Sequence, residues 1–288
     1  MNTSLITNIV NINNLEKYAA IIGEKPSTGA RSPKLWNAVF RMSSLNYSMV
    51  PLDVTRDNIV NLLDSLNSDE SFIGGAIAAP YKEVVLEWLD GNATPEANNI
   101  GAVNCLYRDV DGKLMGTNTD GEASLATFNL SAEALTSKSV MILGIGGAGK
   151  AVASYFSPGT GSTIIISRSD DGKSYADKLN VKWANWLQID DYLDAVDVVI
   201  NCTSLGFGSQ ENKSPLSKEQ ISRLKKTTIV YDIIYQPQRT PLLDMSEKNG
   251  LLILNGLNMN LEQAVLAYKY AVKTDYSLEE IRIIMAGK

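Results

Sequence analysis

The stretch Val140-Met-Ile-Leu-Gly-Ile-Gly-Gly-Ala-Gly-Lys150 decides the fold class. An apolar run of strand length, 140–143, leads directly into the spacing Gly-x-Gly-x-x-Gly at Gly144, Gly146 and Gly149. In a dinucleotide-binding fold these glycines allow a tight turn, close approach of the backbone to a pyrophosphate and close packing of the next helix. The residues expected to bind a dinucleotide here are Gly144, Gly146, Gly147, Ala148 and Gly149.

The same glycines also match a P-loop, Gly144-x4-Gly149-Lys150, up to its last position. That position holds Ala151, which lacks the hydroxyl that binds magnesium in a P-loop. A nucleotide triphosphatase is therefore disfavoured. A plain glycine-rich turn stays open as an alternative.

A second apolar run, 163–166, ends at Ser167-Arg168-Ser169. At this place an acidic residue typically binds the ribose of NAD, whereas an arginine accommodates the 2′-phosphate of NADP. Arg168 beside the neutral Ser167 favours NADP, and the following Asp170 keeps NAD possible. The alternative interpretation is a solvated, charged turn.

Short apolar runs alternate with amphipathic segments on both sides of the glycine loop, which predicts an α/β fold. Ser32-Pro33 indicates a helix with Ser32 as its N-cap. Asp111-Gly112 indicates a hairpin between 103–107 and 114–116. The other predicted strands are 18–22, 47–54 and 72–79, followed by 140–143, 163–166, 196–200, 228–232 and 251–254, and we expect the last five to be parallel and fully buried. Helices are predicted over 56–66 and 81–89, from about 119, and over 261–272 and 278–285, where the last two are expected to fold back on the first domain.

Composition excludes several classes of function. The 288 residues are 44% hydrophobic and 20% charged, as in folded proteins of one or two domains. A net charge of −6 gives no electrostatic drive toward nucleic acid. The chain has no histidine, which excludes a Ser-His-Asp triad, a Cys-His dyad and a His-ligated metal. Cys105 and Cys202 lack the spacing of a metal or disulfide site, so no metal is expected.

The chain shows no targeting pattern. No apolar run approaches the ~18–20 residues of a membrane span. The first 16 residues lack a basic segment followed by an apolar one. We expect a cytoplasmic protein without a membrane partner, either a monomer or a homodimer.

Two titratable residues stand where a strand gives way to a helix, the place at which α/β sheets carry their sites. Lys82 follows Pro80-Tyr81, and Asp120 lies within Asn118-Thr119-Asp120-Gly121. Taken singly, Lys82 is equally well a surface lysine, and Asp120 a helix-capping carboxylate.

Several motifs occur together in one order along the chain. They are Ala30-Arg31-Ser32-Pro33, Pro80-Tyr81-Lys82, Gly101-Ala102-Val103-Asn104, Gly116-Thr117-Asn118-Thr119-Asp120-Gly121, Ser167-Arg168-Ser169, Asn201-Cys202-Thr203-Ser204-Leu205-Gly206, the segment 232–237 and the segment 256–263. In these motifs the sequence resembles the shikimate dehydrogenase and quinate dehydrogenase family from about residue 18 to 272.

The resemblance implies hydride transfer between NADP, or NAD, and a hydroxyl-bearing carbon of an alicyclic hydroxy acid. It implies that Lys82 and Asp120 are catalytic, hydrogen-bonded to the reacting oxygen. Substrate binding is implied for Ser32, Asn104, Tyr235 and Gln263, and cofactor binding for Ser167, Arg168, Ser169, Asn201, Thr203, Gly256 and Met259. The implied domains are a substrate domain, 1–121 with 256–288, and a Rossmann domain, 122–255, with the active site in the cleft between them.

The sequence also departs from the family pattern. Ala30 and Ala78 stand where the family has a serine and a threonine, and Gly29 and Trp36 replace histidines. A polar substrate group without its partner costs about 1–3 kcal/mol per lost bond. The expected substrate is therefore shikimate or a variant such as quinate or aminoshikimate. The alternative is a dinucleotide-binding regulatory or scaffold protein that has lost turnover.

Overall fold

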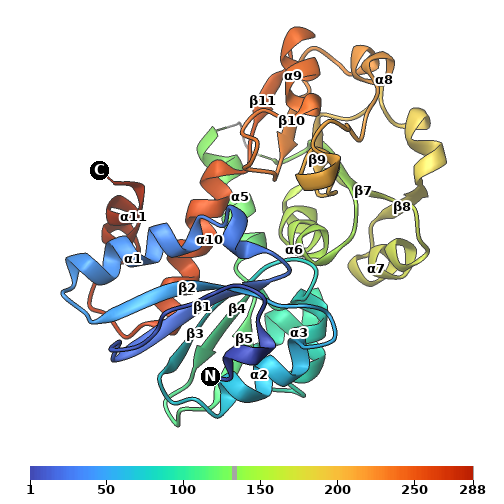
Figure 1. Ribbon diagram of the computed structural model, residues 1–288. Coiled ribbons are helices and arrows are strands. Elements are labelled where there is room, and N and C mark those ends of the chain that lie inside the picture. The colour runs from blue at the N-terminus through green and yellow to red at the C-terminus, as the bar shows by residue number, and fades with distance from the viewer. Residues whose placement is uncertain (132–134, 288) are drawn as a thin grey trace. The chain divides into compact units, whose positions relative to one another are not determined.

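The computed structural model describes residues 1–131 and 135–287, and the chain divides into two compact units (Figure 1). The first unit comprises Met1–Thr119 and Leu261–Lys288, and the second comprises Asp120–Asn260. The sequence places a domain boundary within 121–138, of which 132–134 lie outside the described residues. In each unit, helices cover both faces of a single sheet.

The first unit contains a mixed five-stranded sheet of order β2-β1-β3-β4-β5. The first three strands are parallel, whereas β4 pairs antiparallel with both β3 and β5. The predicted strands and the hairpin of this unit are confirmed. The strands are β1 (Lys17–Gly23), β2 (Tyr47–Asp53), β3 (Phe72–Ile77), β4 (Cys105–Arg108) and β5 (Leu114–Thr117).

Both faces of this sheet are buried, as the apolar residues of β1 show. Ala19 and Ile21 pack toward α1 and the C-terminal helices, while Tyr18, Ala20 and Ile22 pack toward α2 and α3. The C-terminal helices therefore fold back on the first unit as expected. The helices are α1 (Ser32–Met42), α2 (Ile59–Asn67), α3 (Lys82–Trp88), α4 (Pro95–Ile100), α10 (Leu257–Ala271), whose larger part belongs to this unit, and α11 (Leu278–Ala286).

The predicted N-cap of α1 is wrong by one residue. The cap is Arg31, whose φ of −81° and ψ of −23° are already helical, and Ser32 is the first residue of the helix. Because the helical conformation begins before Ser32, its hydroxyl does not have the position of a capping group.

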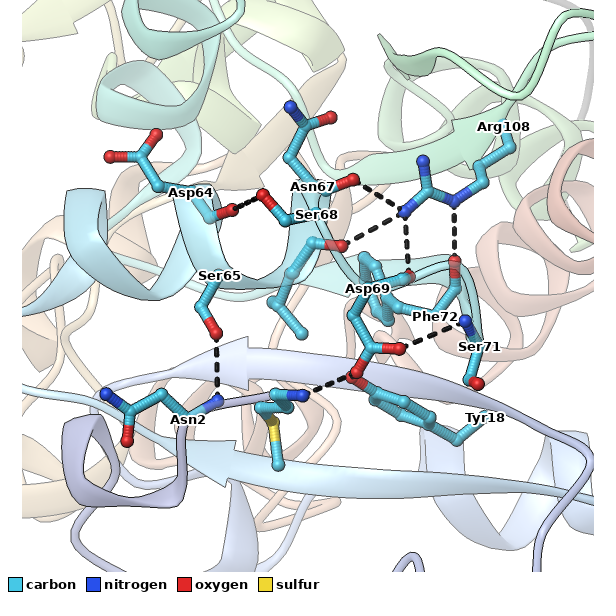
Figure 2. A network of polar contacts seen from close by, with 12 residues as sticks. Asn2, Tyr18, Asp64, Ser65, Asn67, Ser68, Asp69, Ser71, Phe72 and Arg108 are labelled. Atoms are coloured by element: carbon cyan, nitrogen blue, oxygen red, sulfur yellow. Dashed lines mark hydrogen bonds and ion pairs between the residues drawn. The ribbon is translucent and has the colours of Figure 1, made fainter.

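A polar network closes the first unit at the amino ends of β1 and β3 (Figure 2). The Arg108 guanidinium donates to the carbonyls of Leu66, Asn67 and Asp69 at 3.0–3.1 Å, where α2 ends, and to Phe72 O at 2.7 Å. A cation at these carbonyls satisfies acceptors that the helix leaves open. The network anchors this end of the sheet, opposite the edge at which β3 and β5 end.

The second unit contains a six-stranded parallel sheet of order β11-β10-β9-β6-β7-β8. Counted within this unit, that is the 3-2-1-4-5-6 order of a Rossmann fold. The strands are β6 (Ser139–Leu143), β7 (Ser162–Ser167), β8 (Lys182–Asn185), β9 (Val198–Asn201), β10 (Ile229–Asp232) and β11 (Leu252–Leu254). One face is covered by α5 (Asp120–Ser131), α6 (Gly147–Phe156) and α7 (Asp171–Leu179), and the other by the 3-10 helix η4 (Trp186–Asp191), α8 (Lys218–Arg223) and α9 (Pro241–Lys248).

Two features of this sheet differ from the sequence prediction. The sequence does not predict β8, because this four-residue strand begins and ends with a polar residue and contains no apolar run of strand length. β11 is not fully buried, with Leu252 51% exposed, because the strand lies at the sheet edge and has a neighbour on one side only. Among the described residues, no helix is long and apolar enough to span a membrane, and no cluster of acidic or cysteine side chains could hold a metal.

Candidate active site

The glycine loop of the second unit has the geometry of a dinucleotide cradle. Gly144 adopts a φ of +91°, which favours glycine, and a Cβ on Gly149 would overlap the Gly144 carbonyl oxygen. Gly146 caps α6, and a Cβ placed on it meets nothing within 4 Å. The space beside Gly146 at the start of α6 is therefore open, and the first turn of a helix carries N–H groups without intrahelical partners, which suits a pyrophosphate.

The structure brings Asn201 and Thr203 to this loop. Asn201 pairs with Leu143 in register, and Cys202 N donates to Leu143 O at 2.8 Å. The Asn201 Oδ1 accepts from Thr203 N at 3.0 Å and from Thr203 Oγ1 at 2.7 Å. These residues follow β9, and the strand order reverses between β6 and β9, where open α/β sheets bind their ligands.

Asp232 is a residue of this site that the sequence reasoning missed. Its Oδ1 accepts from Asn201 Nδ2 and Ile234 N, both at 3.1 Å, and its Oδ2 accepts from Thr240 Oγ1 at 2.7 Å. Burial raises the pKa of Asp232 to about 6, although these three donors favour its ionised form. A carboxylate at the end of an apolar strand, within the segment 232–237, was the signal that could have revealed it.

The turn after β7 exposes some of its predicted residues and buries another. Arg168 and Ser169 are exposed, whereas Ser167 is 3% exposed. The Ser167 hydroxyl donates to Ser169 O at 2.9 Å and accepts from Trp183 Nε1 at 2.8 Å.

Gly256 lies against the segment that carries Tyr235. Its N–H donates to Ile234 O at 3.0 Å, and a Cβ on Gly256 would overlap Ile233 O. Tyr235 is half-buried, and Met259, in the first turn of α10, is 5% exposed. Only a glycine allows this close approach of the two chain segments.

In the first unit, Thr119 joins Asn104 to the backbone of Gln263, and the backbone of Lys82 is bonded to the residue before Asn104. Val103 N donates to Lys82 O at 2.9 Å, which places the start of α3 beside the residue before Asn104. Asn104 is 2% exposed and binds Thr119 twice, at 2.8 and 3.0 Å, while Thr119 Oγ1 donates to Gln263 O at 3.2 Å. Lys82 is half-buried. Thr119, which the sequence does not single out, links the Asn104 side chain to the backbone of Gln263.

Asp120 follows Thr119 directly and begins both α5 and the second unit, with 5% of its surface exposed. Ser32 lies at the start of α1 and is 2% exposed. Ala30 and Ala78 are half-buried and contact the apolar cluster that contains Trp36. This part of the first unit is thus apolar at both positions where hydroxyls were expected.

Comparison with known proteins follows the same division of the chain. Residues 21–106 match the family described as shikimate dehydrogenase substrate binding domain, and residues 116–233 match the NAD binding domain of D-isomer specific 2-hydroxyacid dehydrogenases. A shikimate dehydrogenase (NADP(+)) of Methanocaldococcus jannaschii is 30% identical over 285 residues, 96% of this chain and 99% of the relative. The chain belongs to the shikimate dehydrogenase family.

Other members of the shikimate dehydrogenase family extend the likeness. A shikimate dehydrogenase (NADP(+)) of Carboxydothermus hydrogenoformans is 33% identical, covering 90% of this chain and 92% of the relative. A quinate dehydrogenase of Corynebacterium glutamicum, solved in complex with NAD, superposes with a TM-score of 0.78 at 26% identity, covering 96% of this chain and all of the other. The resemblance found in the motifs is therefore confirmed over almost the whole chain.

Proposed function

We propose that this protein is an NAD(P)-dependent oxidoreductase acting on an alicyclic hydroxy acid of the shikimate or quinate type. The observation that carries the proposal is the near-complete match to shikimate dehydrogenases, supported by the hydrogen bonds through which Thr119 joins Asn104 to the backbone of Gln263 in the first unit. The first unit then binds the substrate and supplies Lys82, and the second binds the dinucleotide.

Different residues of this chain have different roles in the proposed reaction. Oxidising a hydroxyl requires its proton to leave, and Lys82 takes that proton as a general base, a role that contributes about 10²–10⁴-fold in rate. Asp120 is the second catalytic group, Asn104 and Gln263 bind further hydroxyls, and Ser32 and Tyr235 bind the acid end. When bound, the nicotinamide accepts or donates the hydride.

The cofactor-binding part consists of the glycine loop, the turn at Arg168, the Asn201–Thr203 turn, Gly256 and Met259. The open space at Gly146 and the close packing of Gly149 fit a pyrophosphate at the start of α6. NADP is the preferred cofactor because exposed Arg168 offers a guanidinium that suits the 2′-phosphate. The two unpaired thiols, Cys105 and Cys202, support a cytoplasmic location.

An assay of NADP+ and NAD+ reduction with shikimate, quinate and aminoshikimate tests the proposal. We expect turnover with at least one of these acids and a higher kcat/KM with NADP+ than with NAD+. Tight dinucleotide binding without turnover on any acid would contradict the proposal and favour a regulatory protein.

A further inference from the structure

The turn after β7 is held by two hydrogen bonds of the Ser167 hydroxyl, which we call the clamp. The proposed function does not use these bonds. The hydroxyl of Ser167 lies between Trp183 of β8 and the carbonyl of Ser169, at 2.8 and 2.9 Å. An indole N–H can only donate, so Trp183 fixes the Ser167 hydroxyl as its acceptor. The single hydroxyl proton of Ser167 is then directed to Ser169 O, and this bond closes the turn around Arg168.

A second contact constrains the same hydroxyl. Gly172 N donates to Ser169 O at 3.2 Å, and a Cβ on Gly172 would overlap Ser167 Oγ and approach Trp183 Nε1 to 2.9 Å. The φ of Gly172 lies outside the left-handed region, so space rather than backbone strain makes glycine necessary. Trp183 of β8, Gly172 of α7 and Ser169 of the turn thus all lie against the Ser167 Oγ atom.

The clamp determines which side chains the turn can offer to a ligand. Because its proton is directed to Ser169 O, Ser167 cannot donate to a phosphate without giving up that hydrogen bond. Arg168 is exposed and has no hydrogen bond or ion pair with the other described residues. The exposed Asp170 lies two residues further on and carries the opposite charge.

We propose that Trp183 is a positioning residue for cofactor selectivity, which holds Ser167 and thereby fixes the turn that presents Arg168 to the 2′-phosphate of NADP. The proposal rests on the proposed function only in that the second unit binds the dinucleotide. Loosening the turn weakens the contact of Arg168 with the 2′-phosphate and leaves the parts that NADP and NAD share unchanged.

The test is the ratio of the dissociation constants of NAD+ and NADP+, measured by calorimetry for the full-length wild type and Trp183→Phe. This change removes the indole N–H and keeps an aromatic ring. Loss of one hydrogen bond is expected to weaken NADP+ binding about 2- to 12-fold, with NAD+ binding changed less than about 2-fold. Ser167→Ala and Gly172→Ala, which disrupt the clamp from other elements, should shift the ratio in the same direction.

Trp186→Phe is the matched control, because Trp186 begins η4 and its indole has no hydrogen bond among the described residues. It should leave the ratio unchanged. An unchanged ratio of dissociation constants in Trp183→Phe, or a wild type that prefers NAD+, overturns the inference about Trp183. Turnover of a substrate by that same wild type would still support the proposed function. A wild type that binds NADP+ or NAD+ without turnover contradicts the proposed function, but the ratio of dissociation constants still tests the role of Trp183. A wild type that binds neither dinucleotide contradicts the proposed function and the inference about Trp183.

Discussion

Lys82 is the residue on which the proposed chemistry depends most. Replacing Lys82 by Ala removes the general base, so kcat should fall at least about 10²-fold, the lower end of the range for such groups. Cofactor affinity should remain, because Lys82 belongs to the first unit and the dinucleotide cradle to the second. Steady-state kinetics and calorimetry with NADP+ measure the two quantities separately.

A matched variant separates this effect from the loss of any helix-initiating lysine. Lys218 begins α8 as Lys82 begins α3, and Lys218→Ala should leave kcat unchanged. Asp120→Asn should lower kcat less than Lys82→Ala. If Lys82→Ala keeps more than about a tenth of kcat, Lys82 is not the base.

Ala30 and Ala78 concern the choice of substrate. Replacing them by Ser and Thr restores the hydroxyls of the family pattern, each worth about 0.5–1.5 kcal/mol net if it meets the substrate, or roughly a 2- to 12-fold gain in kcat/KM for shikimate. The gain should appear mainly in KM, since the reacting hydroxyl is at the other end of the ring.

Ala271→Ser is the control, because Ala271 contacts the same apolar cluster as Ala30 and Ala78 but belongs to no predicted site. It should not improve KM. A wild type that already turns over shikimate quickly with a micromolar KM would argue against an altered substrate.

At the scale of elements, the carboxyl ends of β9 and β10 are joined by the buried Asp232. The pKa of this carboxyl is raised by burial, so the folded chain holds its proton more tightly than the unfolded chain. Ionisation therefore costs folding free energy as pH rises from the ordinary value near 3.8 to about 6. A rise of the pKa from 3.8 to about 6 corresponds to roughly 3 kcal/mol.

The asparagine of Asp232→Asn does not ionise, so this variant does not lose folding free energy at residue 232 as pH rises. Its free energy of unfolding relative to wild type should rise by up to about 3 kcal/mol between about pH 3.5 and pH 7, measured by urea unfolding. Asp197 is the control of opposite sign: burial opposes its ionisation, but the Ser139 N–H and Lys225 outweigh burial and lower its pKa. Asp197→Asn should become less stable relative to wild type as pH rises from the acid side through the ordinary value near 3.8. A pH-independent difference for Asp232→Asn would contradict the assignment.

At the scale of the whole molecule, each sheet gathers several of the predicted residues at one of its edges. In the second unit the parallel order puts the glycine loop, Asn201 and Asp232 at the ends of adjacent strands. In the first unit, Asn104 and Thr119 meet because β4 and β5 run antiparallel beside β3. In each unit, the residues of the candidate site therefore come from segments that are far apart in the sequence.

The sequence by itself determined the α/β class, the glycine loop, the hairpin and the family. These features depend on local patterns: apolar runs of strand length, turn residues and ordered motifs. It also singled out Lys82 and Asp120, because each comes where a predicted strand gives way to a helix, whereas Asn104 was implied by the resemblance.

Only the tertiary structure decided the hydrogen-bond partners of Asp232, Thr119 and Trp183. Their hydrogen bonds to Thr240, Gln263 and Ser167 join residues 8, 144 and 16 positions apart, which no local pattern encodes. It likewise showed that Ser167 is turned inward and that Leu252 is exposed at a sheet edge. Burial and hydrogen-bond partners depend on which strands become neighbours, and that pairing is fixed by packing across the whole sheet.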